Sequence, residues 1–389
     1  MTKLTQLIEH YCPDGVEYVR LGDVATYYRG LTYSKKNEVE SGGLKVLRAN
    51  NVSLDTQRID WNDVKSVELD KPVKRTCLLK QDDILMVANS GSKAHVGKIA
   101  YINQDFVDVA FGGFMATIRT KDSRSSRYVY HVLCSDEFKA YKDRVLSSAT
   151  INNLKKSIVE EFQIPLPPRE VQDAIVERLD AFAKLIERLD SEIALREKRF
   201  EYYREQLLSF DESVDVEYVE LKEVLRYEQP GKYLVSSTDY DDGFSTPVLT
   251  AGKTFVLGYT DEKTGIYEAS PDDPVMIFDD FTTAFKWVDF PFKAKSSAMK
   301  ILTLAEVDSS FRYIFYAMHD VGVDVTDHKR QWIRTYSKEK IPLPPREVQQ
   351  EIVDKLDTMK ALIDNLKQER ELRGTQFEYY REKLLTFNS

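Results

Sequence analysis

The sequence predicts an α+β protein in which two β-rich mixed domains are joined by two long helices that form an antiparallel coiled coil with pseudo-twofold symmetry. Three observations lead to this prediction. The chain has 389 residues, 42% of them hydrophobic and 31% charged, which is too long for one ordinary core. A segment of 47 residues with helical periodicity occurs twice. The stretches outside this repeat are rich in aromatic and β-branched residues and in turn signals.

The repeat begins with IPLPPREVQ at Ile164 and again at Ile341. It continues without a gap for 47 positions, of which 28 are identical, and chance does not produce this similarity. A weaker similarity links VEYVRLGDV, from Val16, to VEYVELKEV, from Val216. The chain is therefore predicted to consist of two tandem units, each a variable globular segment followed by a nearly invariant one.

These boundaries divide the chain into four parts. We expect a first globular domain at residues 1–165 and a spacer helix at 166–210. A second globular domain follows at 211–342, and a second spacer helix at 343–389.

The repeated segment is predicted to be a helix of roughly 40 residues, or about 60 Å at 1.5 Å per residue. Apolar residues recur in it at alternating steps of four and three, which is typical of a coiled-coil seam. The seam residues are Ile175, Leu179, Phe182, Ile186, Leu189, Ile193, Phe200, Tyr203 and Leu207 in the first copy, and Ile352, Leu356, Met359, Ile363, Leu366, Phe377, Tyr380 and Leu384 in the second. Arg196 interrupts the first seam, and Arg370 and Arg373 interrupt the second. A prolyl pair before each helix suits a helix start.

A single helix with an apolar seam needs a partner, and this chain carries two matching seams. Antiparallel pairing within the chain would give a pseudo-twofold rod with a globular domain at each end. Parallel pairing would place both domains at the same end, and pairing between two chains is a further alternative. We favour the antiparallel form because the domain between the helices can carry the chain outward and back.

Other features of the sequence restrict its class. Cys12, Cys77 and Cys134 are an odd number at wide spacing, which offers no disulfide framework or metal half-site and favours a reducing, cytoplasmic location. No apolar run reaches the roughly 18 residues that a membrane helix needs, so we expect no membrane partner. The segment from Gly91 to Ile99 resembles a phosphate loop but has the wrong spacing and no Mg²⁺-binding hydroxyl. No catalytic or metal site is predicted.

The net charge of −9 argues at first against a nucleic-acid binder. The charge is unevenly distributed, however, since residues 1–163 carry +3 and residues 211–340 carry −9. Both segments also contain local clusters of basic, amide and aromatic residues, the types that contact phosphates and base edges, although solvated loops explain them equally well. The candidates for DNA contact are Arg48, Asn50, Lys93 and Lys155 in the first domain and Lys286, Lys329, Arg330 and Gln331 in the second.

The order of these parts, together with EYYRE and LLSF at the helix end, resembles the specificity (S) subunit of type I restriction-modification enzymes. VANSGSKAHVGKIAYI in the first domain and PVLTAGKTFVLGYT in the second also look like segments of that family. The resemblance covers the whole chain and implies two target recognition domains, each reading one half of a bipartite DNA target. The conserved helices would set the half-site spacing and dock two methylation (M) subunits.

The resemblance further implies a non-catalytic chain without a cofactor of its own. S-adenosylmethionine, ATP and Mg²⁺ would belong to the M subunits and to the restriction (R) subunits of the full complex. The candidates for partner docking are Arg196, Tyr202, Tyr203, Arg370, Arg373, Tyr379 and Tyr380, and coiled-coil packing explains each of them equally well. Two other functions stay open from the residues alone, a coiled-coil scaffold that binds protein and an enzyme with an unrecognised site.

Overall fold

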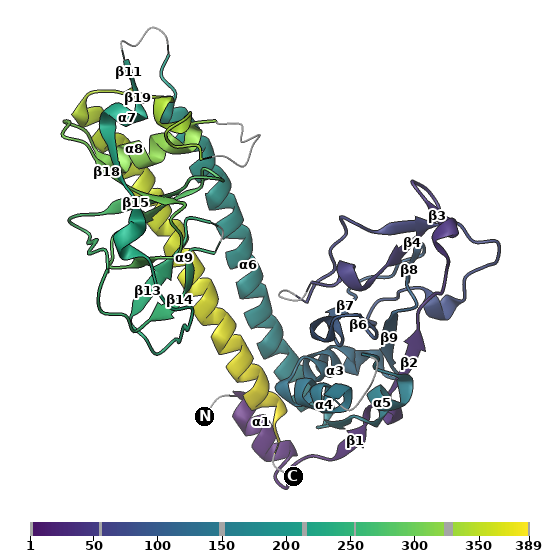
Figure 1. Cartoon of the computed structure of the whole chain (residues 1–389). Helices are drawn as coiled ribbons and strands as arrows, with labels where there is room; N and C mark the ends of the chain where they lie inside the picture. The colour runs from purple at the N-terminus through teal and green to yellow at the C-terminus, as the bar shows by residue number, and fades with distance from the viewer. Residues whose placement is uncertain are drawn as a thin grey trace. The chain divides into compact units, whose positions relative to one another are not determined.

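The structure is a computed structural model that describes residues 3–53, 57–147, 152–211, 216–252, 254–322 and 330–387. The chain folds into two compact units. The first unit comprises Met1–Asp190 and Glu369–Ser389, and the second comprises Ser191–Gln368. Two helices of 40 residues, α6 (Arg169–Leu208) and α9 (Arg346–Leu385), contribute to both units. The two long helices predicted by the repeat are therefore confirmed (Figure 1).

Contacts inside each unit show that α6 and α9 run antiparallel. As the residue number rises along α6, the number of its partner on α9 falls. The contacts are the stack of Phe182 on Tyr380 and the ion pair of Asp190 with Arg370 in the first unit, and the ion pair of Glu197 with Lys367 in the second. The helices thus pair within one chain, in the antiparallel form that the sequence favoured.

The identical start of the two repeats has a structural reason. The side-chain amide of Gln172 donates a hydrogen bond of 2.9 Å to the carbonyl of Pro167, just before α6. Gln349 donates an equivalent bond of 2.8 Å to Pro344, just before α9. Each glutamine is buried, so the bond gives a partner both to its buried N–H group and to the carbonyl of the proline before the helix.

The first domain is built on two four-stranded sheets. One is antiparallel, in the order β2 (Ala25–Arg29), β9 (Met115–Thr120), β6 (Ile84–Val87) and β7 (Ile99–Tyr101). The other has the order β3 (Glu38–Val39), β5 (Lys65–Val67), β4 (Leu44–Leu47) and β8 (Val109–Phe111), with β4 and β8 parallel. A separate pair joins β1 (Tyr18–Arg20) to β10 (Gln163–Pro165). The helices are α1 (Lys3–Tyr11), α2 (Leu21–Val24), α3 (Ser126–Leu133), α4 (Asp136–Ser147) and α5 (Lys156–Glu161).

The second domain repeats this strand order, except that its second sheet has three strands among the described residues and no counterpart of β3. Its antiparallel sheet is β12 (Leu225–Glu228), β18 (Met299–Leu304), β15 (Val275–Asp279) and β16 (Phe285–Val288). Its other sheet is β14 (Val256–Thr260), β13 (Thr246–Leu249) and β17 (Lys293–Ala294), with β13 and β17 parallel. β11 (Glu217–Glu220) pairs with β19 (Lys340–Leu343), and the helices are α7 (Leu221–Val224) and α8 (Phe311–Ala317). The duplication therefore extends through the variable domains, where little sequence similarity remains.

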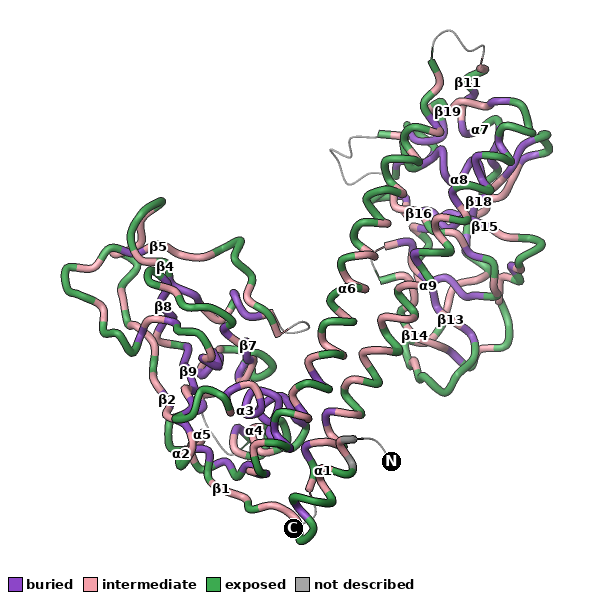
Figure 2. Tube along the Cα trace, turned by 180° about the vertical axis from the view of Figure 1, so that it is seen from behind, coloured by how far each residue is buried: buried purple, intermediate pink, exposed green. Residues whose placement is uncertain are grey.

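The core of each domain continues onto the first turns of the long helix that follows it. Ile175 and Leu179 of α6 are fully buried in the core of the first domain, and Leu356 of α9 is fully buried in the second. The middle of both helices is mostly exposed or half-buried (Figure 2). The start of each predicted seam thus packs against the domain that precedes it. The end of each helix also reaches a domain core, through Phe377 and Leu384 of α9 in the first unit and through Phe200 and Leu207 of α6 in the second. No described helix is long and apolar enough to cross a membrane.

Candidate nucleic-acid interface

A small hollow on the first domain gathers basic and amide side chains. Its volume is about 220 Å³. It is lined by Tyr27, Arg29, Ala88, Asn89, Gly113, Asn153, Lys155 and Lys156, and we call it the basic hollow. Lys155 and Lys156 are exposed, and the Arg29 guanidinium donates a hydrogen bond of 3.1 Å to the carbonyl of Gly113. Lysine and arginine beside asparagine can hold phosphates and also reach base edges.

Backbone hydrogen bonds hold together the chain segments that form this hollow. The Leu154 N–H donates to the carbonyl of Ala88 at 2.8 Å, and the backbones of Asn89 and Asn153 form an isolated antiparallel β-bridge. Gly30 lies so close to Gly112 that a Cβ on Gly30 would come within 2.2 Å of its carbonyl oxygen. Only glycine fits this approach, so the loops that carry Arg29 and Gly113 are fixed to each other.

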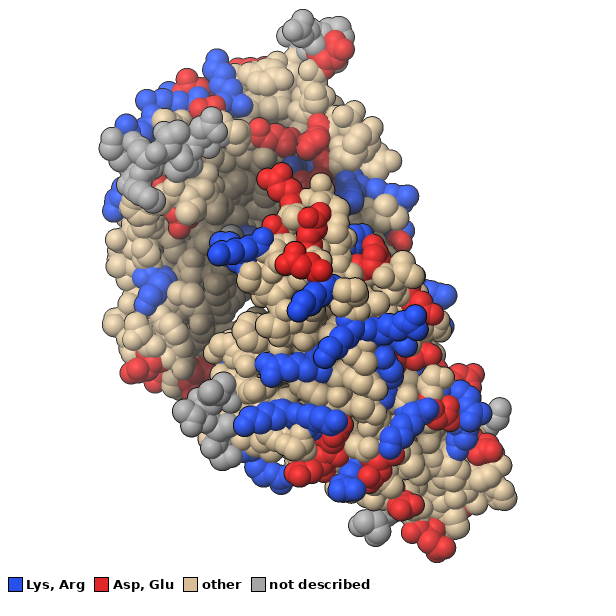
Figure 3. Space-filling view, turned by 90° about the vertical axis from the view of Figure 1, so that its right-hand side faces the viewer, with Lys and Arg blue, Asp and Glu red and all other residues tan. Residues whose placement is uncertain are grey.

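Basic side chains are numerous on the first domain, and one of those that line the hollow, Lys156, lies 3.7 Å from the Glu160 carboxylate. Figure 3 shows Lys and Arg side chains running across the middle of the face turned to the viewer. Exposed basic residues of the first domain include Lys71, Lys74, Arg75, Lys80 and Lys121, in addition to those of the hollow. A face of this kind attracts the phosphate backbone of a nucleic acid without regard to its sequence.

The same place in the second domain carries different side chains. The offset of 177 residues between the repeats aligns Asn153 with Arg330 and Lys155 with Trp332. The Gln331 N–H donates to the carbonyl of Asp280 at 2.8 Å, as the Leu154 N–H does to Ala88. Arg330 is exposed, whereas Trp332 is buried. The two domains therefore present the same backbone frame with different chemistry.

Behind this edge of the second domain lies a buried ion pair. Lys300 Nζ lies 3.0 Å from Asp280 Oδ2, without hydrogen-bonding geometry between the two atoms, and the side chains are 0% and 1% exposed. The other carboxylate oxygen of Asp280 accepts the Trp332 N–H at 2.8 Å. The pair thus holds the segment that begins at Arg330 against the central sheet.

Comparison with known proteins decides the family. The model of the family described as "Type I restriction modification DNA specificity domain" matches residues 13–195 and 213–372. The chain belongs to this family. Each match covers one globular domain and the larger part of the long helix that follows it. The specificity domain therefore occurs twice in the chain.

Relatives and solved structures agree with this family. The chain is 50% identical over 195 residues to the EcoR124I/EcoR124II specificity subunit of Escherichia coli, covering 48% of this chain and 47% of that protein. It is 30% identical over 205 residues to the EcoKI specificity subunit of E. coli K12, covering 52% and 42%. These alignments span less than half the length of the relatives. The S subunit of Mycoplasma genitalium has the same fold, with a TM-score of 0.61 at 16% identity, over 97% of this chain and 98% of that one.

The other first-domain candidates do not line the basic hollow, unlike Lys155. Lys93 is exposed on a short turn that follows Asn89. The Arg48 guanidinium and the Asn50 amide both donate to the Asp63 carboxylate, at 2.9 and 3.0 Å. A phosphate at Arg48 would therefore compete with Asp63. All four candidates stay predictions.

The structure corrects one candidate in the second specificity domain. Gln331 is 4% exposed, and its side-chain oxygen accepts a hydrogen bond from the Thr335 hydroxyl at 3.0 Å. The prediction that it contacts DNA is wrong, because its amide serves the interior of the domain. Lys286 and Arg330 are exposed and stay predictions. Lys329 lies outside the described residues.

The candidates for partner docking lie on the long helices in two kinds of environment. Tyr202, Tyr203 and Tyr379 are 58%, 48% and 58% exposed, so their rings are available to a partner. Tyr380 stacks on Phe182 inside the helix pair. The three arginines make ion pairs on the helices: Arg196 with Glu192, Arg370 with Asp190, and Arg373 with Glu369. Docking by any of these residues stays a prediction.

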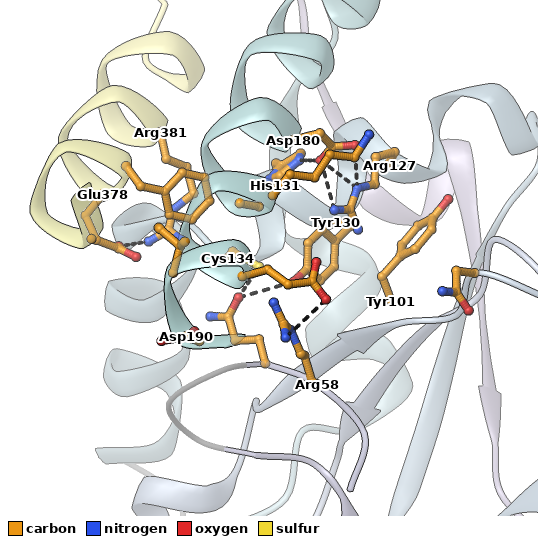
Figure 4. A pocket seen from close by; sticks show the side chains of 18 of the residues that line it. Arg58, Tyr101, Arg127, Tyr130, His131, Cys134, Asp180, Asp190, Glu378 and Arg381 are labelled. Atoms are coloured by element: carbon orange, nitrogen blue, oxygen red, sulfur yellow. Dashed lines mark hydrogen bonds and ion pairs between the residues drawn. The ribbon is translucent and has the colours of Figure 1, made fainter. Parts of the chain in front are cut away.

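Sequence reasoning missed a junction that fixes the first domain to α6. Arg127 of α3 and Asp180 of α6 form an ion pair of 2.8 Å, and His131 Nε2 lies 2.9 Å from the same carboxylate (Figure 4). Burial lowers the pKa of His131. Burial alone would raise the pKa of Asp180, but the hydrogen bond from His131 and the charge of Arg127 bring it below its usual range. The sequence signal was the Arg-Tyr pair that recurs as Arg312-Tyr313 in α8.

A larger cavity of about 920 Å³ opens beside this junction, within the first unit. Its walls carry arginines that are paired with carboxylates of the same walls. The pairs are Arg58 with Glu187, Arg127 with Asp180, Arg370 with Asp190 and Arg381 with Glu378. Because these charges neutralise one another, the cavity has less attraction for phosphate than the basic hollow.

Proposed function

We propose that this chain is the DNA sequence-specificity subunit of a type I restriction-modification complex, and that each globular domain reads one half of a bipartite DNA target. The observation that carries the proposal is the double match to the specificity-domain family, on two domains with the same strand order. The family match favours this function over a protein-binding scaffold.

The chemistry of the two domains supports different half-sites. The first domain offers Lys155 and Lys156 with Asn89 and Asn153 around the basic hollow. The second offers Arg330 at the equivalent edge, backed by the buried Lys300. Cations position a protein on the phosphate backbone, and different side chains at the base edges select different sequences. Two domains of one frame can therefore recognise two unrelated half-sites.

The long helices supply the spacing in this proposal. Each has 40 residues, which at 1.5 Å per residue is about 60 Å. We infer that lengthening one helix lengthens the gap that the protein tolerates between half-sites. An insertion of four residues, about one turn, is expected to change the gap and leave both half-sites unaltered. An unchanged gap in a methylation assay would refute the spacing role.

The chemical steps are assigned to partner chains. Two M subunits would dock on the helices and methylate adenine with S-adenosylmethionine, and R subunits with ATP and Mg²⁺ would complete the complex. This chain would itself be non-catalytic and would bind double-stranded DNA weakly by itself, since its net charge is −9. The complex would work in the cytoplasm, where the three free cysteines stay reduced.

Mapping of methylated adenines tests the proposal directly. The chain is expressed with its M subunits in a host without other methylation, and the genome is sequenced by a method that detects N6-methyladenine. The expected result is one bipartite motif with a fixed gap, and footprinting of the complex should protect two separated tracts. A scaffold would leave the DNA unmethylated and unprotected, and an enzyme with its own site would methylate or cleave DNA without partners.

A further inference from the structure

An exposed aromatic ring stands beside the basic hollow. Phe114 follows Gly113 in the loop between β8 and β9, and its side chain is 65% exposed. It is the most exposed phenylalanine among the residues that the structure describes. A single apolar residue on a surface is ordinary. The surroundings of Phe114 therefore decide whether its exposure has a purpose.

The backbone that carries this ring is fixed on both sides. The carbonyl of Phe114 accepts hydrogen bonds from the Ala88 N–H at 2.9 Å and from the Asn89 N–H at 3.0 Å. A Cβ on the neighbouring Gly113 would come within 3.0 Å of the Thr32 hydroxyl, so this residue is closely packed as well. The loop therefore cannot fold the ring away without breaking the contacts that hold the central sheet edge. The backbone that carries the ring therefore needs no ordering when the ring binds, and only the side-chain rotamer has to be fixed.

The position of the ring suits contact with a base. Gly113 forms part of the wall of the basic hollow, and Arg29 binds its carbonyl. Phosphates held by Lys155 and Lys156 would therefore bring the bases of the same duplex next to Phe114. Apolar side chains contact thymine methyl groups in the major groove and wedge between base steps in the minor groove.

The second domain lacks this ring at the same backbone position. There the Asp280 N–H donates to the carbonyl of Ala298 at 3.1 Å, as the Ala88 N–H does to Phe114. The residues that follow, Met115 and Met299, both pair with the central strand of their sheet. Ala298 is thus the counterpart of Phe114, and the ring distinguishes the first domain from the second.

We propose that Phe114 makes an apolar contact with a base in the half-site read by the first domain and thereby contributes to its specificity. This inference rests on the proposed function. The contact is made by the ring itself, against either the methyl group of a thymine or the face of a base at an opened step.

The test uses the complex of this chain with its M subunits, on duplexes that carry the mapped motif. Phe114→Ala is expected to weaken binding at least about fivefold and to relax the preference at one or two positions of one half-site, because the contact between the aromatic ring and a base is lost. Phe114→Leu should retain part of the effect. The matched control is Val107→Ala, since Val107 is 90% exposed but lies at the other end of β8, and its binding should be unchanged.

Two further measurements identify the contact. Uracil in place of thymine in this half-site should weaken the wild-type complex but not Phe114→Ala if the ring meets a methyl group. A rise in 2-aminopurine fluorescence that the variant lacks would place the ring at an opened step. Unchanged affinity and an unchanged motif in Phe114→Ala would overturn the inference while leaving the proposed function intact, whereas a wild-type complex that selects no motif would overturn both. Retention of the other half-site shows that the variant is folded.

Discussion

The two units fix their domains to the long helices with the same ion pair. In the first unit Arg127 of α3 and Asp180 of α6 lie 2.8 Å apart, and in the second Arg312 of α8 and Asp357 of α9 also lie 2.8 Å apart. Each guanidinium also lies over aromatic rings, which shields the pair from water. The rings are Tyr101 and Tyr130 in the first unit and Trp287, Phe315 and Tyr316 in the second. The duplication has thus kept the joint between domain and spacer while the domains diverged.

In each joint, a third side chain contacts the carboxylate of the ion pair, and this side chain differs between the two units. His131 bonds to Asp180 in the first unit, and the Tyr316 hydroxyl donates to Asp357 in the second. Burial raises the pKa of Tyr316, so this phenol stays neutral at all ordinary pH values. Burial lowers the pKa of His131, so protonation of this imidazole opposes the folded state. The joint of the first unit thus carries an imidazole where the joint of the second carries a neutral phenol.

A second difference lies at the central strands. The second domain buries Asp280 and Lys300 where the first has Ala88 and Ala116. A buried ion pair contributes little net stability, but removal of one partner leaves a buried charge. The first domain fills the equivalent positions with the methyl groups of Ala88 and Ala116. Substitutions at these positions should therefore cost the first domain less stability.

The largest effect is expected from breaking the buried pair. Lys300→Ala should destabilise the second domain by about 3 to 5 kcal/mol, because Asp280 then remains buried without a countercharge. The double variant with Asp280→Ala, which copies the first domain, should recover part of this loss. Hydrogen exchange of peptides from the second unit measures both, with exposed Lys286→Ala as the control. A single variant within about 1 kcal/mol of wild type would show that the pair is not the support inferred here.

The next largest effect is expected at the joints. Asp180→Ala should destabilise the first unit by about 2 kcal/mol and Asp357→Ala the second by about 1 kcal/mol, since solvent screens the more exposed pair. The carboxylate side chains are 26% and 40% exposed. Hydrogen exchange of α3 and α8 peptides separates the two losses. Equal losses of stability in the two variants would mean that neither the exposure of the carboxylate nor the identity of the third side chain changes what the ion pair contributes.

A smaller effect is expected at the hollow. Lys155→Ala should weaken binding of the complex to all DNA sequences alike, and the slope of log affinity against log salt should fall by about one for each phosphate that the side chain no longer neutralises. Lys155→Arg keeps the charge and should behave as wild type. Arg330→Ala makes the same test in the second domain. Identical salt slopes in Lys155→Ala and wild type would remove this lysine from the interface.

The smallest effect is expected from exchanging the third partners. The lowered pKa of His131 means that its contribution to stability is fully present above the ordinary histidine value of about 6.5 and is lost as the pH falls below it. His131→Tyr, which copies the second joint, should make the first unit less sensitive to pH between 7.5 and 5. His319 in the second unit, whose pKa burial and nearby cations lower to about 4, stays in both proteins as an internal reference. If hydrogen exchange in α3 has the same pH dependence in the wild-type protein and in His131→Tyr, His131 is not the group whose titration changes the stability.

Sequence reasoning succeeded where the signal is local and failed where it depends on distant partners. The long helices were predicted because a seam of alternating steps is legible in consecutive residues. Their antiparallel pairing was favoured because the domain between them can carry the chain outward and back. The joint was missed because Arg127 and Asp180 are 53 positions apart, and the recurring Arg-Tyr pair does not by itself indicate the carboxylate that it meets. Gln331 was misassigned because its segment folds back onto Asp280, which no pattern of polar residues indicates.

The sequence by itself determined the duplication, the two spacer helices and the kinship to the specificity family, because these are recorded in the order and period of residues. Only the tertiary structure decided which charges face outward. It placed Lys155 beside Arg29 and Asn89 in the basic hollow and left Phe114 exposed next to them, while it buried Lys300 and Gln331. Burial depends on contacts between segments far apart in the chain, so residues of the same type have opposite roles in two domains with one strand order.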